Sequence, residues 1–218
     1  MLRNVDLSEI SDGKLYDAND MVKADCKGCD GCSACCRGMG KSIVLDPLDV
    51  HRLTTGLGVP FEALLSQHIE LNVVDGLILP NLKMTESADA CPFLNAQGRC
   101  SIHAYRPGIC RLFPLGRFYE NDSFQYFLQV HECPKPSKAK IKVYKWLDTD
   151  DIRTYEQFIS DWHYFLKALQ ERIARMEDQT QIRSICMYVL QQFYLAPCED
   201  FYEAFQGRLN EAKRHFEM

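Results

Sequence analysis

The chain of 218 residues lacks several features that would assign it to a familiar class of protein. No apolar run approaches the roughly 18 to 20 residues of a membrane-spanning helix, and the N-terminus is polar and acidic, without the apolar core of a secretory signal. No long basic run occurs and the formal net charge is −5, which argues against a nucleic-acid partner. We therefore expect a cytoplasmic protein that binds neither membranes nor nucleic acids and keeps its thiols reduced.

The motifs of several enzyme classes are absent as well. Neither the dinucleotide-binding GxGxxG nor the phosphate-binding GxxxxGK[ST] occurs. The CxxxCxxC run of radical enzymes that use S-adenosylmethionine is missing, because Cys32 and Cys36 give its first spacing but Met39 does not continue it. No nucleophile set of His, Cys and Asp stands out. By these criteria the sequence assigns no enzymatic reaction.

Cysteine is the residue that the chain has in excess. It has eleven cysteines, and nine of them lie in the segment 26–133. In a reducing compartment such a density indicates metal binding rather than disulfides. The nine candidate metal ligands are Cys26, Cys29, Cys32, Cys35, Cys36, Cys91, Cys100, Cys110 and Cys133. The other two, Cys186 and Cys198, lie in or beside an amphipathic helical segment, where small buried cysteines are ordinary, and we assign them no chemistry.

Residues 26–36 read CKGCDGCSACC and hold five of these cysteines. Thiolates spaced by three residues can turn inward around one ion or cluster, and Gly28 and Gly31 allow the tight loop that this needs. Adjacent side chains diverge, so we expect Cys35 and Cys36 to serve two neighbouring sites. About eight thiolates would fill two four-ligand sites and leave one candidate spare.

A second group of motifs follows, namely CPFL at 91–94, GRCSIH at 98–103 and RPGICRLFP at 106–114. Together with CDGCSACC they resemble, in this order, the CxxCxxCC cysteine-cluster family, also called the YkgJ-like zinc- or iron-chelating domain. The resemblance covers residues 29–114 and implies a compact metal-binding domain. The ligands that it implies are Cys29, Cys32, Cys35, Cys36, Cys91, Cys100 and Cys110. We expect Cys133 to join them, whereas Cys26 lies outside the shared pattern.

The spacing leaves two classes of metal centre open. Serial CxxC steps are typical of iron–sulfur clusters and favour a cluster here. The second group contains no CxxC, however, and widely spread thiolates suit zinc equally well. We expect an iron–sulfur cluster rather than zinc, at two sites.

Three further residues lie close to the second cysteine group. His103 stands three residues after Cys100, as a ligand would, but a loop histidine that hydrogen-bonds to the backbone is the more ordinary interpretation. Arg106 and Arg111 flank Cys110. They could offset the negative charge of the thiolates or hold an anionic substrate, and equally they could be structural arginines that bind loop carbonyls.

The pattern of apolar residues predicts a helix-rich α+β fold. An irregular, metal-stapled, cysteine-rich domain with small hairpins is expected to pack on a C-terminal helical segment. We expect a weakly structured lead-in over residues 1–25, the cysteine-cluster metal-binding domain over 26–134 and the helical segment over 150–217. Residues 135–142 are expected to form a polar linker.

Local signals predict the elements of the cysteine-rich part. Residues 42–45 are expected to form a short strand. Asp46 and Pro47 predict the N-cap and first residue of a helix that stops at 56–58. A second helix is expected over residues 60–71, opened by its proline.

Turn and periodicity signals predict the remaining elements. Asp-Gly and Asn-Asp pairs predict hairpins over residues 73–79 and 117–130. Apolar residues at helical spacing predict helices over 152–176, over 180–195 and from residue 197 onward.

The leading hypothesis is a cytoplasmic metal-binding protein that carries an iron–sulfur cluster and acts in electron transfer or cluster handling with a protein or redox partner. The family resemblance also includes proteins similar to flagellin lysine N-methylase, which implies a second hypothesis, an iron–sulfur-dependent methyltransferase or oxidoreductase. A third is a zinc-stapled interaction module without a redox role. Colour separates the third from the others, because zinc is colourless and thiolate-bound clusters are brown.

Overall fold

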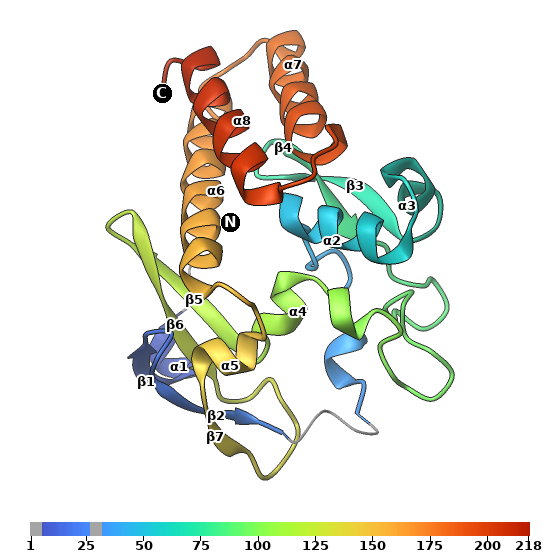
Figure 1. The fold of residues 1–218 in the computed structure, drawn as a ribbon, viewed down its shortest axis with the longest axis vertical. Coiled ribbons are helices and arrows are strands. Elements are labelled where there is room, and N and C mark those ends of the chain that lie inside the picture. Colours follow the sequence, from blue (N-terminus) through green and yellow to red (C-terminus); the bar gives the residue numbers. More distant parts are fainter. Residues whose placement is uncertain (1–5, 27–31) are drawn as a thin grey trace.

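The computed structural model describes residues 6–26 and 32–218, and its fold is helix-rich α+β (Figure 1). Short helices and antiparallel strand pairs come first, and the long helices α6 (Ile152–Ile173), α7 (Gln179–Val189) and α8 (Phe201–His215) follow. The predicted fold class is confirmed. None of the helices in the described part of the chain is long and apolar enough to cross a membrane.

Within the segment expected to form a weakly structured lead-in, residues 11–16 and 21–25 form strands instead. After α1 (Leu7–Ile10), β1 (Ser11–Tyr16) pairs antiparallel with β6 (Ser123–Gln129). β6 also pairs with β5 (Leu115–Glu120), so the strand order is β1-β6-β5. The sequence of β1 is mostly polar, and its strand conformation comes from hydrogen bonds to a distant segment, which no local pattern shows.

The predicted polar linker over residues 135–142 is also partly wrong. β7 (Ala139–Lys142) pairs antiparallel with β2 (Met21–Asp25), and the two form a separate sheet. Lysine-rich β7 reads as a loop in the sequence because its stability comes from its partner strand.

α2 (Pro47–Leu57) begins where the sequence predicted. The Asp46 carboxylate accepts a hydrogen bond from the Asp49 amide at 2.8 Å, and the Asp49 carboxylate accepts one from the Asp46 amide at 3.1 Å. The two residues thus form a capping box. Gly58 ends the helix in the left-handed conformation, with a φ of 66°.

Both predicted hairpins are present, and the first is longer than expected. β3 (Ile69–Val74) and β4 (Leu77–Leu82) are joined by an Asp-Gly turn, with φ values of 48° at Asp75 and 87° at Gly76. β3 begins where the predicted second helix would continue, so that helix is confined to α3 (Phe61–Gln67). The β5–β6 hairpin turns at Asn-Asp, as the sequence predicted.

Residues 42–45 make a single backbone bridge to β4 rather than the predicted strand. The Leu45 amide donates to the Pro80 carbonyl at 2.9 Å, but Pro80 has no N–H with which to return the bond. The Leu45 carbonyl accepts instead from the hydroxyl of Tyr194 at 3.0 Å. Proline in β4 therefore ends the ladder, and a residue of the C-terminal part takes up the remaining acceptor.

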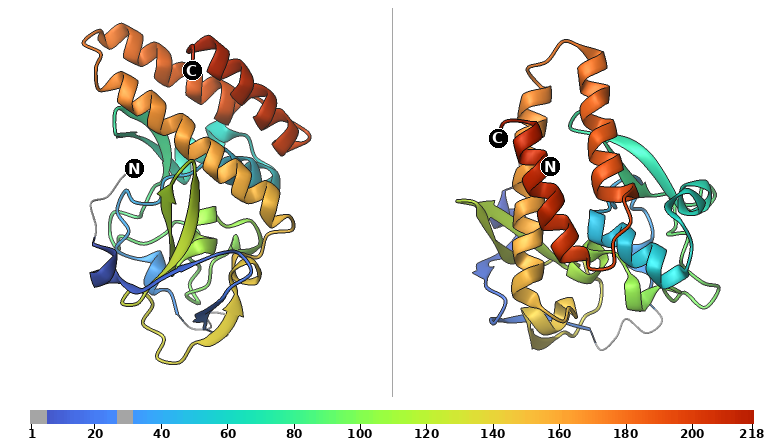
Figure 2. Two further views of the ribbon diagram at one scale, coloured as in Figure 1. Left: turned by 90° about the vertical axis from the view of Figure 1, so that its left-hand side faces the viewer. Right: turned by 45° about the horizontal axis from the view of Figure 1, so that its top comes forward.

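The C-terminal helices and the first half of the chain share one large hydrophobic core. Leu53 of α2, Leu79 of β4 and Leu169 of α6 belong to the same buried cluster. Aromatic rings fill its helical side, with the centroids of Trp162 and Phe193 5.0 Å apart. Figure 2 shows α6, α7 and α8 packed together at one end of the molecule. The segments expected as two domains therefore do not have separate cores.

α7 continues as a π-helical stretch, Leu190–Leu195, so the predicted helix over 180–195 is confirmed in extent. The chain then turns through residues 196–200 and enters α8.

A second, smaller core lies among β2, β5, β6 and α5 (Val143–Leu147). α4 (Gly108–Leu112) lies between the two cores, because Leu112 belongs to the smaller core while the Gly108 amide binds a residue of α2. Figure 1 shows α4 between α2 and α5. The segment that carries Cys110 is therefore held from both sides.

Candidate metal centre

Five of the nine candidate cysteines lie near one another, and three of these five, Cys91, Cys100 and Cys110, pack against the large core. The five are Cys35, Cys36, Cys91, Cys100 and Cys110, here called the cysteine set. Each thiol is close enough to another member that charge on one shifts the pKa of the other. The structure thus brings together the end of the first cysteine run and the second cysteine group.

Backbone hydrogen bonding joins these two parts. Cys35 and Cys36 lie in a 3-10 turn, Ala34–Cys36. The Cys36 carbonyl accepts from the Cys91 amide at 2.8 Å, and the next residue pairs with Ala90 in an antiparallel bridge. This short contact fixes Cys36 beside Cys91 although they are far apart in the chain.

A tight turn carries the chain from Cys91 to Cys100. The Asn95 side chain accepts from the amides of Gln97 at 3.0 Å and Arg99 at 2.9 Å. Gly98 takes a positive φ of 71° within the turn. The sequence NAQGR therefore reverses the chain and brings Cys100 back toward the set.

Cys110 is the most enclosed member of the set. Burial is the main cause that raises the pKa of its thiol, and the carboxylate of Asp49 raises it further. Burial also raises the pKa values of Cys91 and Cys100. Several adjacent thiolates are unfavourable in such a place without a cation, and a bound metal would remove that cost.

Cys35 and Cys36 do not diverge as the sequence predicted. Their thiols hydrogen-bond to each other, and this bond is the main cause that raises the pKa of Cys35 and lowers that of Cys36. Consecutive side chains in a 3-10 turn are separated by about 120°, whereas in a strand they point to opposite faces. The turn therefore leaves the two thiols side by side, and the two-site expectation stays a prediction.

The four other candidates have different positions. Cys26 is buried directly after β2, and Cys133 follows β6, so both belong to the strand-rich part of the molecule. Cys32 is half-buried shortly before the 3-10 turn. Cys29 lies outside the described residues. Metal ligation by these four stays a prediction.

Within residues 6–26 and 32–218, no three His, Cys, Asp or Glu side chains are arranged so that they could hold a metal ion. The thiols of the cysteine set are close enough to shift one another's pKa values, but they are not arranged to bind one ion together. Their donor chemistry nevertheless fits, because zinc and iron–sulfur centres both accept four thiolates. Metal binding would replace the Cys35–Cys36 hydrogen bond and release the remaining thiol protons.

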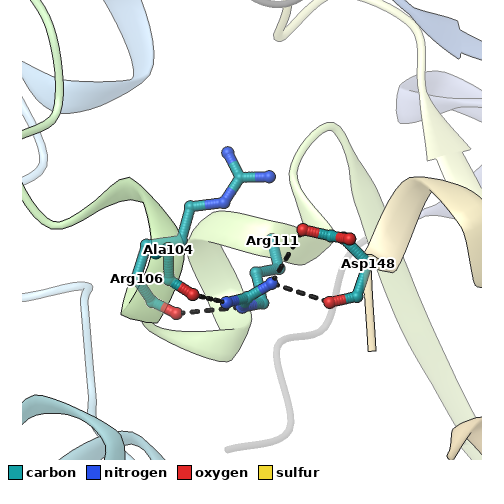
Figure 3. Close-up of polar contacts among 4 residues, drawn as sticks. All are labelled: Ala104, Arg106, Arg111 and Asp148. Atoms are coloured by element: carbon teal, nitrogen blue, oxygen red, sulfur yellow. Dashed lines mark hydrogen bonds and ion pairs between the residues drawn. The ribbon is translucent and has the colours of Figure 1, made fainter. Parts of the chain in front are cut away.

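Arg111 is a structural arginine (Figure 3). Its Nε donates to the carbonyl of Arg106 at 3.2 Å, its Nη1 to the carbonyl of Asp148 at 2.8 Å, and its Nη2 to the carbonyl of Ala104. Its Nη1 also lies 3.4 Å from the Asp148 carboxylate. Arg111 therefore joins the loop before α4 to the residue after α5, which supports the structural interpretation of this side chain.

His103 is exposed at the start of a short 3-10 helix, His103–Tyr105. Burial of its ring and the positive charges of Arg106 and Arg111 lower its pKa. The role of His103 as a metal ligand stays a prediction.

Asp49 is the residue of this region that the sequence analysis missed. Its Oδ1 accepts a hydrogen bond from the Gly108 amide at 2.6 Å, which anchors the start of α4 two positions before Cys110. The spacing of Asp46 and Asp49 signals a capping box, which accounts for the hydrogen bonds between these two residues but not for the bond to Gly108. The second partner lies 59 residues away and leaves no local signal.

Comparison with known proteins identifies the family. No curated protein and no solved structure matches the chain. A family model, CxxCxxCC, matches residues 28–134, and the motif resemblance is thereby confirmed. The match includes Cys133 and all of the cysteine set, and it begins after Cys26. Residues 28–134 therefore belong to the CxxCxxCC family, described as a putative zinc- or iron-chelating domain.

Proposed function

We propose that the protein binds an iron–sulfur cluster through its cysteine set and acts in electron transfer or cluster handling in a reducing compartment. The observation that carries the proposal is the purely sulfur donor set of five neighbouring thiols. Iron–sulfur clusters are held by four cysteine thiolates, often from closely spaced cysteines. The series ending in Cys35 and Cys36 supplies that spacing, and the second group supplies the remaining thiolates.

The placement of the set supports a redox role. All five cysteines are partly exposed, and Cys91, Cys100 and Cys110 pack against the large core. A centre there would be anchored by packed residues and would still be near enough to the surface to exchange electrons or cluster with a partner. The potential of such a centre depends on solvent exposure and on hydrogen bonds to sulfur.

A zinc-stapled interaction module is the second candidate. The observation that favours it is the position of α4, which carries Cys110, between the two cores, where a metal would fix segments distant in sequence. Structural zinc sites with four cysteines do this in many small domains.

Anaerobic purification followed by absorption spectroscopy and analysis of iron, zinc and acid-labile sulfide tests the proposal. We expect a brown protein that contains iron and sulfide in similar amounts. C36S and C110S should lose most of the iron, whereas C186S and C198S, outside the set, should retain it. A colourless protein that contains zinc would overturn the cluster in favour of the zinc module.

A further inference from the structure

Arg106 and Arg111 both flank Cys110, but the structure uses them differently. The guanidinium of Arg111 is held by three backbone carbonyls, one of which belongs to Arg106. Figure 3 shows the guanidinium of Arg106 pointing away from those carbonyls. Arg111 thus fixes the backbone from which the Arg106 side chain projects.

The guanidinium of Arg106 contains an unused donor. Its Nε is buried and has no hydrogen-bond partner among the residues that the structure describes. Buried N–H groups of native proteins nearly always have a partner, and an exception calls for an explanation such as an absent ion or ligand. For Arg106, we look for this explanation in the nearby thiols of Cys35 and Cys100.

The positive charge of Arg106 reaches two members of the cysteine set. Burial raises the pKa of Cys100, while the Ile102 amide and the charge of Arg106 lower it. The hydrogen bond to Cys36 is the main cause that raises the pKa of Cys35, and Arg106 again acts in the opposite direction. Arg106, in the loop before α4, is therefore a cation near enough to these two thiols to act on both.

We propose that Arg106 is a positioning residue of the metal centre, whose Nε–H donates to the sulfur of Cys35 or Cys100 in the loaded protein and whose charge offsets that of the thiolates. The inference rests on the proposed metal-binding function. It holds for either metal, because four thiolates leave a net negative charge around zinc and around an iron–sulfur cluster alike. Hydrogen bonds to ligand sulfurs tune affinity and reduction potential.

The test compares wild type with R106Q, R106K and R111Q as reduced, metal-free proteins. Zn²⁺ affinity is measured by competition with a chromogenic chelator, and folding is checked by thermal melting. R106Q should bind Zn²⁺ about 10 to 100-fold more weakly with little change in melting temperature. R106K keeps the charge without the Nε–H and should fall between wild type and R106Q. R111Q should melt at a lower temperature but bind Zn²⁺ like wild type below its melting point.

A second readout follows anaerobic reconstitution with iron and sulfide. The reduction potential of R106Q should be more negative than that of wild type. The reduced centre carries more negative charge than the oxidised one, so removal of a nearby cation destabilises the reduced centre more. Equal affinity and equal potential in wild type and R106Q would overturn the role of Arg106 and leave the proposed function intact. Equal weakening in R106Q and folded R111Q would also overturn it. Failure of wild type to bind either metal would overturn the proposed function itself.

Discussion

The carboxylate of Asp49 accepts a hydrogen bond from the backbone amide of Gly108 across a distance of 2.6 Å. Asp49 is only 2% exposed and also closes the capping box at the start of α2. One side chain therefore joins the beginnings of α2 and α4, and Cys110 lies two residues beyond this junction.

The junction concentrates buried polar groups. Burial is the main cause that raises the pKa values of both Asp46 and Asp49. Arg117 donates to the hydroxyl of Tyr155 at 2.9 Å, and its positive charge acts against the raised pKa of Asp46. The position of α4 thus depends on a compact polar contact as well as on apolar packing.

Substitution of Gly108 by alanine should destabilise the protein. A Cβ atom at this position would lie 2.8 Å from the hydroxyl oxygen of Tyr155 and 3.5 Å from Oδ1 of Asp49. We expect G108A to lose about 1–3 kcal/mol of unfolding free energy, measured by urea denaturation, because the junction must open to admit the methyl group.

The matched control for G108A is G207A. Gly207 lies in α8, and a Cβ there meets nothing within 4 Å. Alanine should stabilise this helix position by about 0.5–1 kcal/mol. Equal effects of the two substitutions would show that the junction does not constrain position 108.

Substitution of Asp49 by asparagine should weaken the same junction. Either orientation of the amide turns its NH₂ group toward one of the two backbone N–H donors, Asp46 or Gly108. We expect a loss of about 1–3 kcal/mol in unfolding free energy. D151N is the control, because Asp151 is an exposed N-cap and asparagine caps equally well. A D49N protein as stable as D151N would contradict the prediction.

Cys36 should be the most reactive thiol of the cysteine set in metal-free protein. The hydrogen bond from Cys35 lowers the pKa of Cys36, whereas the pKa values of the four other members are raised. Limited iodoacetamide labelling at neutral pH, read by peptide mass spectrometry, should modify Cys36 first. C35A, which removes the donor, should slow that labelling. Preferential labelling of Cys110 would contradict the prediction.

Acid should destabilise the protein through His163. The ring of His163 stacks on Tyr119 with centroids 3.5 Å apart, and burial is the main cause that lowers its pKa to about 4. An unfolded histidine titrates near about 6.5, so between these values the unfolded chain binds a proton that the folded protein does not. The unfolding free energy therefore falls as pH drops through this window.

Urea denaturation of H163F at several pH values checks this contribution. The variant should lose less stability than wild type between about pH 6.5 and 4, because phenylalanine has no proton to bind. H131Q, at an exposed position, controls for removal of a histidine. Parallel curves for wild type and H163F would contradict the assignment to His163.

Metal removal should loosen only part of the cysteine-rich segment. α2 and the β3–β4 hairpin share their core with the C-terminal helices and should stay folded without metal. Chelator should therefore leave most of the helical circular dichroism and expose the turn before Cys100 to trypsin at Arg99. Equally fast cleavage at Arg52 in α2 would show that the metal supports the whole domain.

The sequence by itself determined the elements whose signals are local. The capping residues at Asp46 and Pro47 gave the start of α2, and the Asp-Gly turn gave the β3–β4 hairpin. Apolar spacing predicted α6, and the order of the cysteine motifs identified the metal-binding family. The helix start, the turn and the apolar spacing each depend on residues within a few positions of one another, and the family depends on the order of motifs along the chain.

Only the tertiary structure decided which distant residues meet. It paired β1 with β6, joined Asp49 to Gly108 and distinguished the carbonyl-bound Arg111 from Arg106. These contacts are set by the path of the chain around two cores, where a buried polar group is stable only beside a suitable partner. The amino-acid types state which bonds a residue can make, and the fold decides which partner is within reach.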